Sequence, residues 1–279
     1  MTDGNGVIDI QEIIFFDGNA AIGRTSIPHN SPICSPDELV NDMKKIRLSR
    51  ALVFHTESLN DPVFGNDLLI KAIAEYPELT GCAVLAPAAS GEFGDIAKYV
   101  EYLVGSGIKA IRLFPRIHFY TIKSYVLSSV LEQALRYRLP VILDFITHER
   151  LSYIESTWDF FPDYDDIYLL AKEWPEIPFI VAIPGMTSQR RQYALLNACE
   201  NVFLETSGYS YRFIENVCKR FSANRLIAGS YMPRVDPSAM MLGVLYANIS
   251  EREKQMIAND NLEKLIACVG KRENINDYI

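Results

Sequence analysis

The clearest structural signal in the chain is Pro140-Val141-Ile142-Leu143-Asp144-Phe145, a short and almost continuously apolar run. Strands of a parallel sheet show this pattern because both of their faces are covered, whereas half-exposed strands alternate apolar and polar residues. Seven similar runs flank it, at residues 13–17, 51–55, 81–85, 108–114, 178–183, 201–206 and 225–229. Eight runs of this kind predict eight parallel strands, the number that closes an α/β barrel.

Longer amphipathic segments separate the runs and are typical of helices. The clearest helix start is Ser35-Pro36-Asp37-Glu38, which places a capping serine, a first-turn proline and two acids before residues 39–48. Further helices are expected at 92–104, 124–137, 164–174, 188–199, 209–221 and 237–247, with two more at 250–258 and 261–269. Because no linker or repeat interrupts the alternation, we predict one α/β domain over residues 1–279, a single (β/α)8 TIM barrel with C-terminal helices.

Composition narrows the classes of partner. The net charge of -8 disfavours broad binding to nucleic acid or to anionic membranes, and no apolar run approaches the roughly 18 residues of a spanning helix. The polar residues 1–6 do not show a secretory signal, and the five cysteines include no CxxC pair, so we expect reduced thiols and a cytoplasmic location. Neither GxGxxG nor Walker spacing occurs among the glycines, so no nucleotide cofactor is expected.

Polar residues that follow the predicted strands are the candidates for function, because barrels of this kind place their chemistry at the carboxyl ends of the strands. These residues are Asp17, Asn19, His55, Glu57, Arg112, Asp144, His148, Glu205 and Tyr231.

Several segments, taken in order, resemble the amidohydrolase-related family of metal-dependent TIM-barrel hydrolases, which includes aromatic-acid decarboxylases and a metal-free dicarboxylate lactonase. They span most of the chain: FDGNAAIG (16–23), GIKAIRLFP (107–115), LPVIL (139–143), NVFLETSG (201–208), NRLIAGS (224–230) and NDNLEKL (259–265). The resemblance implies the barrel fold and a site at its mouth.

That family usually binds a divalent metal through a His-x-His pair after strand 1, histidines at strands 5 and 6, and an aspartate after strand 8. The matching positions here are Asn19 and Ala21, then Asp144, Ile183 and Tyr231. Alanine and isoleucine offer no lone pair to a metal. We therefore expect no metal at the family's site and no cofactor, and a tyrosine is a poor general base near neutral pH.

Arg112 suits a carboxylate because its planar fork donates two parallel hydrogen bonds. An ion pair inside the barrel with Asp144 or Glu205 is an equally good interpretation, since a buried cation needs a partner. His118 resembles a family loop histidine that touches ligand, although a solvated loop histidine is the simpler reading.

Aromatic residues gather near the predicted mouth: Trp158, Phe160, Phe161, Tyr164, Tyr209, Tyr211 and Phe213. They could wall a pocket for a flat ligand, or cover a contact in a homo-oligomer.

The first functional hypothesis is a metal-independent hydrolase that acts on a C–O or C–N bond, of the lactone or amide class, in a small carboxylated molecule. Asp144 or His148 would be the base that activates water, and Arg112 would stabilise the developing negative charge. The expected ligand-binding residues are Asn19, His55, Arg112, His118, Glu205 and Tyr231.

Two alternatives stay open. One is a catalytically inactive pseudo-enzyme or ligand-binding protein, in which the anionic ligand is held without turnover. The other is a metal-dependent hydrolase with replacement ligands from His55, Asp144 and Glu205, joined by His148.

Overall fold

A computed structural model describes residues 13–24, 33–146, 164–182 and 189–270, and in it one sheet runs in the order β2-β1-β3-β4-β5-β6-β7-β8-β9. Eight strands pair in parallel, each at one of the predicted apolar runs, so the eight-stranded α/β prediction is confirmed. They are β1 (Phe15–Arg24), β3 (Leu48–His55), β4 (Leu79–Leu85), β5 (Ile108–Leu113), β6 (Val141–Asp144), β7 (Phe179–Ala182), β8 (Val202–Glu205) and β9 (Leu226–Ile227). The short β2 (Ile33–Cys34), antiparallel to the end of β1, was not predicted.

The barrel closes between β1 and the segment that follows β9. The amide of Gly18 donates to the carbonyl of Ala228 at 2.7 Å, and the amide of Tyr231 donates to the carbonyl of Asn19 at 2.7 Å. Both bonds join residues more than two hundred positions apart in the chain. The first and last strands therefore place their polar ends side by side at the mouth.

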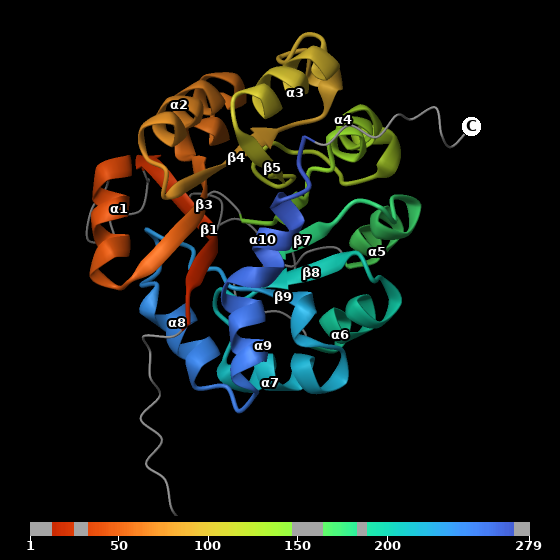
Figure 1. Cartoon of the computed structure of the whole chain (residues 1–279). Helices are drawn as coiled ribbons and strands as arrows, with labels where there is room; N and C mark the ends of the chain where they lie inside the picture. Colours follow the sequence, from red (N-terminus) through yellow and green to blue (C-terminus); the bar gives the residue numbers. More distant parts are fainter. Residues whose placement is uncertain (1–12, 25–32, 147–163, 183–188, 271–279) are drawn as a thin grey trace, which may run out of the picture.

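Helices surround the sheet, as Figure 1 shows. They are α1 (Pro36–Lys45), α2 (Pro62–Glu75), α3 (Ile96–Gly105), α4 (Ser124–Tyr137), α5 (Tyr164–Glu173), α6 (Gln189–Ala198), α7 (Tyr211–Arg220) and α8 (Ser238–Leu245). Ser35 caps α1 in a reciprocal box with Glu38, as its sequence predicts. This helix ends before the predicted residue 48, because Arg47 adopts a left-handed φ of 59° and β3 begins at once.

The helix α2 escaped prediction because Gly65 and Asn66, both weak helix formers, lie within it. Both residues make specific tertiary contacts. A β-carbon at Gly65 would lie 2.2 Å from the amide nitrogen of Ser58, and the Asn66 side chain donates to the carbonyl of Val84 and accepts from its amide. Tertiary packing thus outweighs local helix propensity here.

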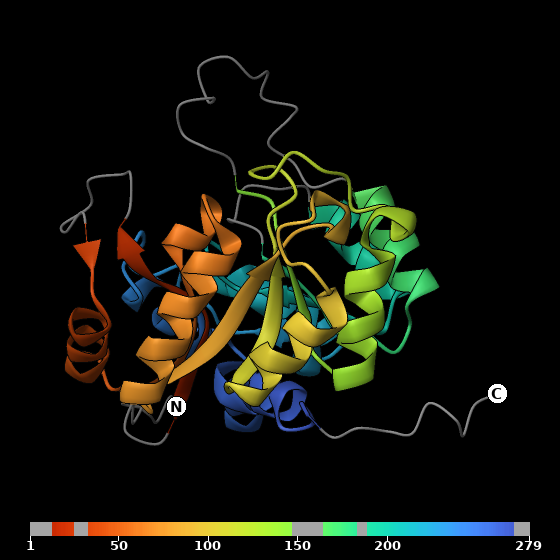
Figure 2. The ribbon, with the colours of Figure 1, turned by 90° about the horizontal axis from the view of Figure 1, so that it is seen from above.

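The C-terminal helices are present as predicted. α9 (Glu251–Gln255) continues through a π turn at Met256–Asp260 into α10 (Asn261–Ile266). Leu262 and Ile266 of α10 pack in one cluster with Phe16 and Leu52 from inside the barrel. α10 therefore covers the amino ends of the strands, and Figure 2 shows the C-terminal helices gathered at that end. The candidate site is therefore sought at the opposite end, where the strands have their carboxyl ends.

Strand alternation decides which side chains face the barrel interior. Ala110 and Ile142 belong to the interior cluster above α10. Side chains two residues further along a strand point to the same face, which brings Arg112 and Asp144 inward at the mouth. Glu205 is inward by the same rule, two residues after Phe203. Within the described ranges, every helix is too short or too polar to cross a bilayer.

Candidate functional site

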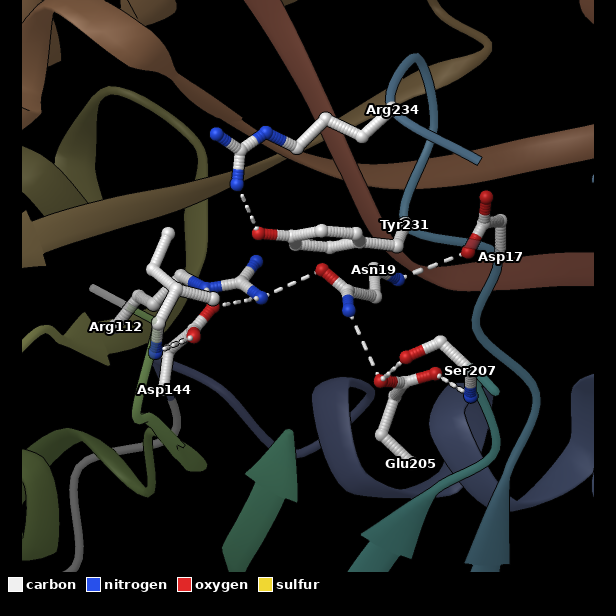
Figure 3. Close-up of polar contacts among 9 residues, drawn as sticks. Asp17, Asn19, Arg112, Asp144, Glu205, Ser207, Tyr231 and Arg234 are labelled. Atoms are coloured by element: carbon white, nitrogen blue, oxygen red, sulfur yellow. Dashed lines mark hydrogen bonds and ion pairs between the residues drawn. The ribbon is translucent and has the colours of Figure 1, made fainter. Parts of the chain in front are cut away.

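A buried ion pair lies at the centre of the mouth, between Arg112 of β5 and Asp144 of β6 (Figure 3). Both Nε and Nη2 of Arg112 donate to Oδ2 of Asp144, at 3.0 and 2.8 Å. The other carboxylate oxygen, Oδ1, accepts from the amide of Ile146 at 3.0 Å. The interpretation of Arg112 as one half of an internal ion pair is therefore confirmed, with Asp144 as its partner.

The rest of the guanidinium is also held in place. Nη2 donates to Oδ1 of Asn19 at 2.5 Å, and the Arg112 guanidinium carbon lies 4.7 Å from the ring centre of Phe54 and 5.5 Å from that of Phe114. The remaining nitrogen, Nη1, is buried and has no hydrogen-bond partner among the described residues. A buried donor without an acceptor is costly, so Nη1 is a point where an added oxygen atom would be stabilised.

Asn19 connects this pair to a second carboxylate, as the dashed lines in Figure 3 trace. Its Nδ2 donates to Oε2 of Glu205 at 2.9 Å. Ser207 donates its hydroxyl to the same oxygen at 2.6 Å, and its amide to Oε1. Because Arg112 only donates and a carboxylate accepts, the orientation of the Asn19 amide is determined by its two neighbours.

Burial shifts the pKa of every acid in this network upward. It raises the pKa of Glu205 to about 7, against hydrogen bonds from Ser207 and Asn19 that favour the charged form. Asp17 bonds the amide and hydroxyl of Ser230 at the barrel seam, and burial raises its pKa to about 6. Burial also raises the pKa of Asp144, while the Arg112 charge opposes the shift. The mouth can therefore hold a proton near neutral pH.

Tyr231 covers this network from the segment after β9. Its φ of 66° is left-handed, and its hydroxyl oxygen accepts from Nη1 of Arg234 at 2.7 Å. Burial raises the pKa of Tyr231 to about 12. The phenol is thus protonated at neutral pH, which agrees with the expectation that it is a poor base.

A cavity of about 170 Å³ opens beside Tyr231. Its lining residues are Asn19, Ala21, Arg24, Phe54, Thr56, Leu59, Asn60, Ile146, Tyr231, Met232, Pro233 and Arg234. They include two arginines and four polar uncharged side chains but no carboxylate. The described wall of this cavity is therefore complementary to an anion.

No protein-family model matches the sequence, and no curated protein matches it closely enough to count as a relative. Solved structures do match. 5-Carboxyvanillate decarboxylase from Sphingomonas paucimobilis aligns with a TM-score of 0.72 and 12% identity, over 92% of this chain and 100% of that one. The chain has the fold of the amidohydrolase-type barrels.

Two further barrels show the same fold. An amidohydrolase II aligns with a TM-score of 0.65 and 15% identity, over 91% of this chain and 99% of the other. A probable 2-pyrone-4,6-dicarboxylic acid hydrolase from Acinetobacter baumannii, with citric acid bound, aligns with a TM-score of 0.61 and 14% identity over 91% and 99%.

The metal positions of the amidohydrolase-type barrel are a poor fit for a divalent ion in the described part of this mouth. The Ala21 side chain has no atom that can coordinate a metal, and both carboxylate oxygens of Asp144 accept hydrogen bonds, from Arg112 and from the amide of Ile146. The Arg112 guanidinium, a fixed positive charge, bridges Asn19 and Asp144, two of the positions where the resemblance places ligands. The described residues contain no group of three or more His, Cys, Asp or Glu side chains arranged to hold a metal. Ile183 lies outside the described residues.

Of the three histidines expected at the site, the two that the structure describes, His55 and His118, do not contact the Arg112 network by any hydrogen bond. His55 is a cap: its Nδ1 accepts from the amide of Glu57, and its Cε1 lies 2.9 Å from where a β-carbon of Gly23 would be. His118 packs edge-on against Phe114, with Nε2 3.3 Å from the carbonyl of Leu59. His148, the other expected base, lies outside the described residues.

The aromatic residues divide in the same way. Tyr209 and Phe213 stack at 4.0 Å between ring centres in the hydrophobic core, and Tyr164 is also buried there. Tyr211 is exposed. Residues 158–161 lie outside the described part of the chain. None of the described aromatics of this group lines the cavity.

Sequence reasoning missed Arg24, Thr56, Asn60, Ser207 and Arg234. Arg234 had a usable signal, because it follows the eighth predicted strand by a few residues and therefore belongs to a mouth loop. Arg24 did not, since β1 runs seven residues beyond the predicted end at Asp17.

Proposed function

We propose that this barrel binds a small carboxylated molecule at its mouth and hydrolyses a C–O or C–N bond in it. The observation that carries the binding half is the cavity beside Tyr231, whose described lining includes Arg24 and Arg234 but no acid. Two arginines around so small a space favour an anionic group, and arginine matches the carboxylate geometry.

The buried network supports the chemical half of the proposal. Asp144 and His148 are the proposed bases for a water molecule, and Arg112 would stabilise negative charge on the attacked oxygen. A carboxyl whose pKa is raised towards the working pH is a better base than an ordinary aspartate, and burial raises the pKa of Asp144. We further propose that this hydrolysis needs no resident metal, because a guanidinium lies between the positions of two family ligands.

The functions for which similar barrels are named bear on the substrate class. One neighbour is named for decarboxylation of 5-carboxyvanillate, and another for hydrolysis of a pyrone dicarboxylic acid. Both molecules are compact rings that carry carboxylate groups, and we propose a substrate of the same kind for this chain.

One observation favours the alternative of a binding protein without turnover. Each oxygen of Asp144 and of Glu205 already accepts a hydrogen bond from the chain itself. A base with a lone pair directed at water is therefore not evident among these two acids. In this alternative the mouth holds its anionic ligand unchanged.

Binding is tested by isothermal titration with benzoate and benzene-1,3-dicarboxylate, and with benzamide as the uncharged counterpart. We expect the carboxylates to bind and benzamide to bind at least tenfold more weakly. Arg24→Gln and Arg234→Gln should each weaken carboxylate binding about tenfold. Lys264→Gln, an exposed lysine on α10 at the closed end, is the matched control and should bind as the unaltered protein does. Equal binding of benzamide and benzoate would contradict the proposal.

Turnover is tested with panels of carboxylated lactones and amides. Loss of hydrolysis in Asp144→Asn and His148→Ala, with folding intact and probe binding retained, would support acid–base catalysis. Carboxylate binding without turnover of any panel member would favour the binding protein. Metal analysis of protein purified without chelator tests the metal-free part, and a stoichiometric divalent ion would contradict it.

A further inference from the structure

The hydroxyl group of Tyr231, a half-buried phenol that lines the cavity, is held by an arginine. Its oxygen accepts from Nη1 of Arg234 at 2.7 Å. An arginine has no acceptor, so the phenol hydrogen must point elsewhere, and no described residue accepts it. A charge-assisted bond to the phenol oxygen also strengthens the outgoing O–H as a donor.

The hydroxyl end of Tyr231 is directed towards the ion pair of Arg112 and Asp144, as Figure 3 shows. The Asp144 charge raises the pKa of Tyr231 and the Arg112 charge lowers it, which agrees with a phenol close to both residues. Arg112 contributes a second unmatched donor, the buried Nη1. Two donors on the same side of the mouth, for which no described residue supplies an acceptor, are complementary to one added oxygen atom.

The backbone holds the phenol in this position. The amide of Tyr231 donates to the carbonyl of Asn19 at 2.7 Å, and the left-handed φ of 66° turns the chain there. Side chains with a β-carbon rarely adopt this conformation. The conformation is thus specified by closure of the barrel.

We propose that Tyr231 donates its hydroxyl hydrogen to an oxygen of the bound anion, opposite Nη1 of Arg112, and that Arg234 orients the phenol for this contact. The proposal rests on the proposed function, since it assigns a binding contact within the same mouth. By the resemblance, position 231 is where relatives carry an aspartate after strand 8. Here the position supplies a proton-bearing donor where those relatives have an acceptor.

The test compares Tyr231→Phe with the unaltered protein by titration of benzoate and benzene-1,3-dicarboxylate. Loss of one hydrogen bond to a charged ligand should weaken binding about tenfold. The control is Tyr246→Phe, an exposed tyrosine that follows α8, and its affinity should not change. Phenylalanine keeps the ring in place, and thermal unfolding verifies that each variant is folded.

The role of Arg234 is tested by combining the changes. Arg234→Met removes the group that orients the phenol, so its effect on affinity should be smaller in the Tyr231→Phe background than in the unaltered protein. Independent, multiplicative losses would overturn the orienting role.

A crystal structure of the unaltered protein with benzene-1,3-dicarboxylate provides a test without substitution. We expect a carboxylate oxygen within hydrogen-bond distance of both Tyr231 Oη and Arg112 Nη1. An anion bound at Arg24 and Arg234 without contact to Tyr231, or a Tyr231→Phe variant with undiminished affinity, would overturn this inference while leaving the proposed function intact. No binding of either carboxylate to the unaltered protein would overturn both.

Discussion

The Glu205 carboxylate packs directly against the backbone of Gly229. A β-carbon at position 229 would lie 2.2 Å from Oε1 of Glu205, so only glycine leaves room for the carboxylate there. The glycine follows β9 and the acid ends β8. Close approach of backbone to side chain, rather than a positive φ, is what requires glycine here. The position of this carboxylate is therefore set jointly by two strands.

Gly229→Ala should displace the Glu205 carboxylate and lower the free energy of unfolding by about 1–3 kcal/mol, the usual effect of overpacking a buried site. Denaturant unfolding measures the loss. Gly105→Ala is the matched control, because a β-carbon there meets nothing within 4 Å, and it should be neutral or slightly stabilising. The destabilisation by Gly229→Ala should shrink in a Glu205→Ala background. A full-sized loss in that background would show that the methyl group clashes elsewhere.

Arg112→Met should lower the free energy of unfolding by about 3–5 kcal/mol, because it leaves Asp144 buried without its cation. Adding Asp144→Asn should recover part of that loss, since the neutral amide is less costly to bury. A double-mutant cycle measured by denaturant unfolding gives the coupling between the two residues. Strictly additive effects would mean that the pair does not interact as the geometry indicates.

Stability should fall as the pH rises from 5 to 8. The folded pKa of Glu205 is raised to about 7 and that of Asp17 to about 6, so between their ordinary values and these values the folded chain binds more protons than the unfolded chain. More bound protons in the folded state mean that stability is greatest at low pH and is lost as pH rises through the folded pKa. Between pH 5 and 8 we expect a combined loss on the order of 4 kcal/mol, at about 1.4 kcal/mol per pKa unit over roughly two units for Glu205 and one for Asp17.

The pH dependence of Glu205→Gln distinguishes this cause from others. Without an ionisable group at 205, stability between pH 6 and 8 should change less than in the unaltered protein. Glu92→Gln, at an exposed position, should keep the original profile. An unchanged slope in Glu205→Gln would assign the effect to another group.

Asn19→Asp should make stability more sensitive to pH than it is in the unaltered protein. The new carboxylate would face Oε2 of Glu205, which lies 2.9 Å from Nδ2 of Asn19, and two acids at that distance must share a proton. Thermal unfolding at pH 5 and at pH 8 should show a small loss at the lower pH and a larger one at the higher. Equal losses at both values would indicate that the two carboxylates move apart.

Much of the architecture could be predicted from the sequence, because a strand buried on both faces appears in it as a continuous apolar run. The apolar run at 140–145 corresponds to β6, and the cap at Ser35 begins α1 where its pattern indicates. α2 could not be predicted in this way, since the buried roles of Gly65 and Asn66 depend on Ser58 and β4. Local propensity carries no information about such partners.

The candidate residues Asn19, Arg112, Asp144, Glu205 and Tyr231 could be named from their places after predicted strands, but their relationships could not. Whether Arg112 pairs with Asp144 or with Glu205 depends on strand order and register, and Asn19 turns out to lie between Arg112 and Glu205. His55 lies at the carboxyl end of a strand as the others do, yet alternation along β3 places Phe54, not His55, against Arg112. Distance from a strand end is visible in a sequence, whereas the direction of a side chain is not.

Apolar periodicity alone was enough to specify an eight-stranded α/β barrel with its polar residues at one end, because burial on both faces constrains composition residue by residue. Closure of the barrel was needed to bring positions 19 and 231 together, to direct Tyr231 towards the ion pair and to leave Nη1 of Arg112 without a partner among the described residues. These are contacts between residues far apart in the chain, and they exist only once the first strand meets the segment after the last.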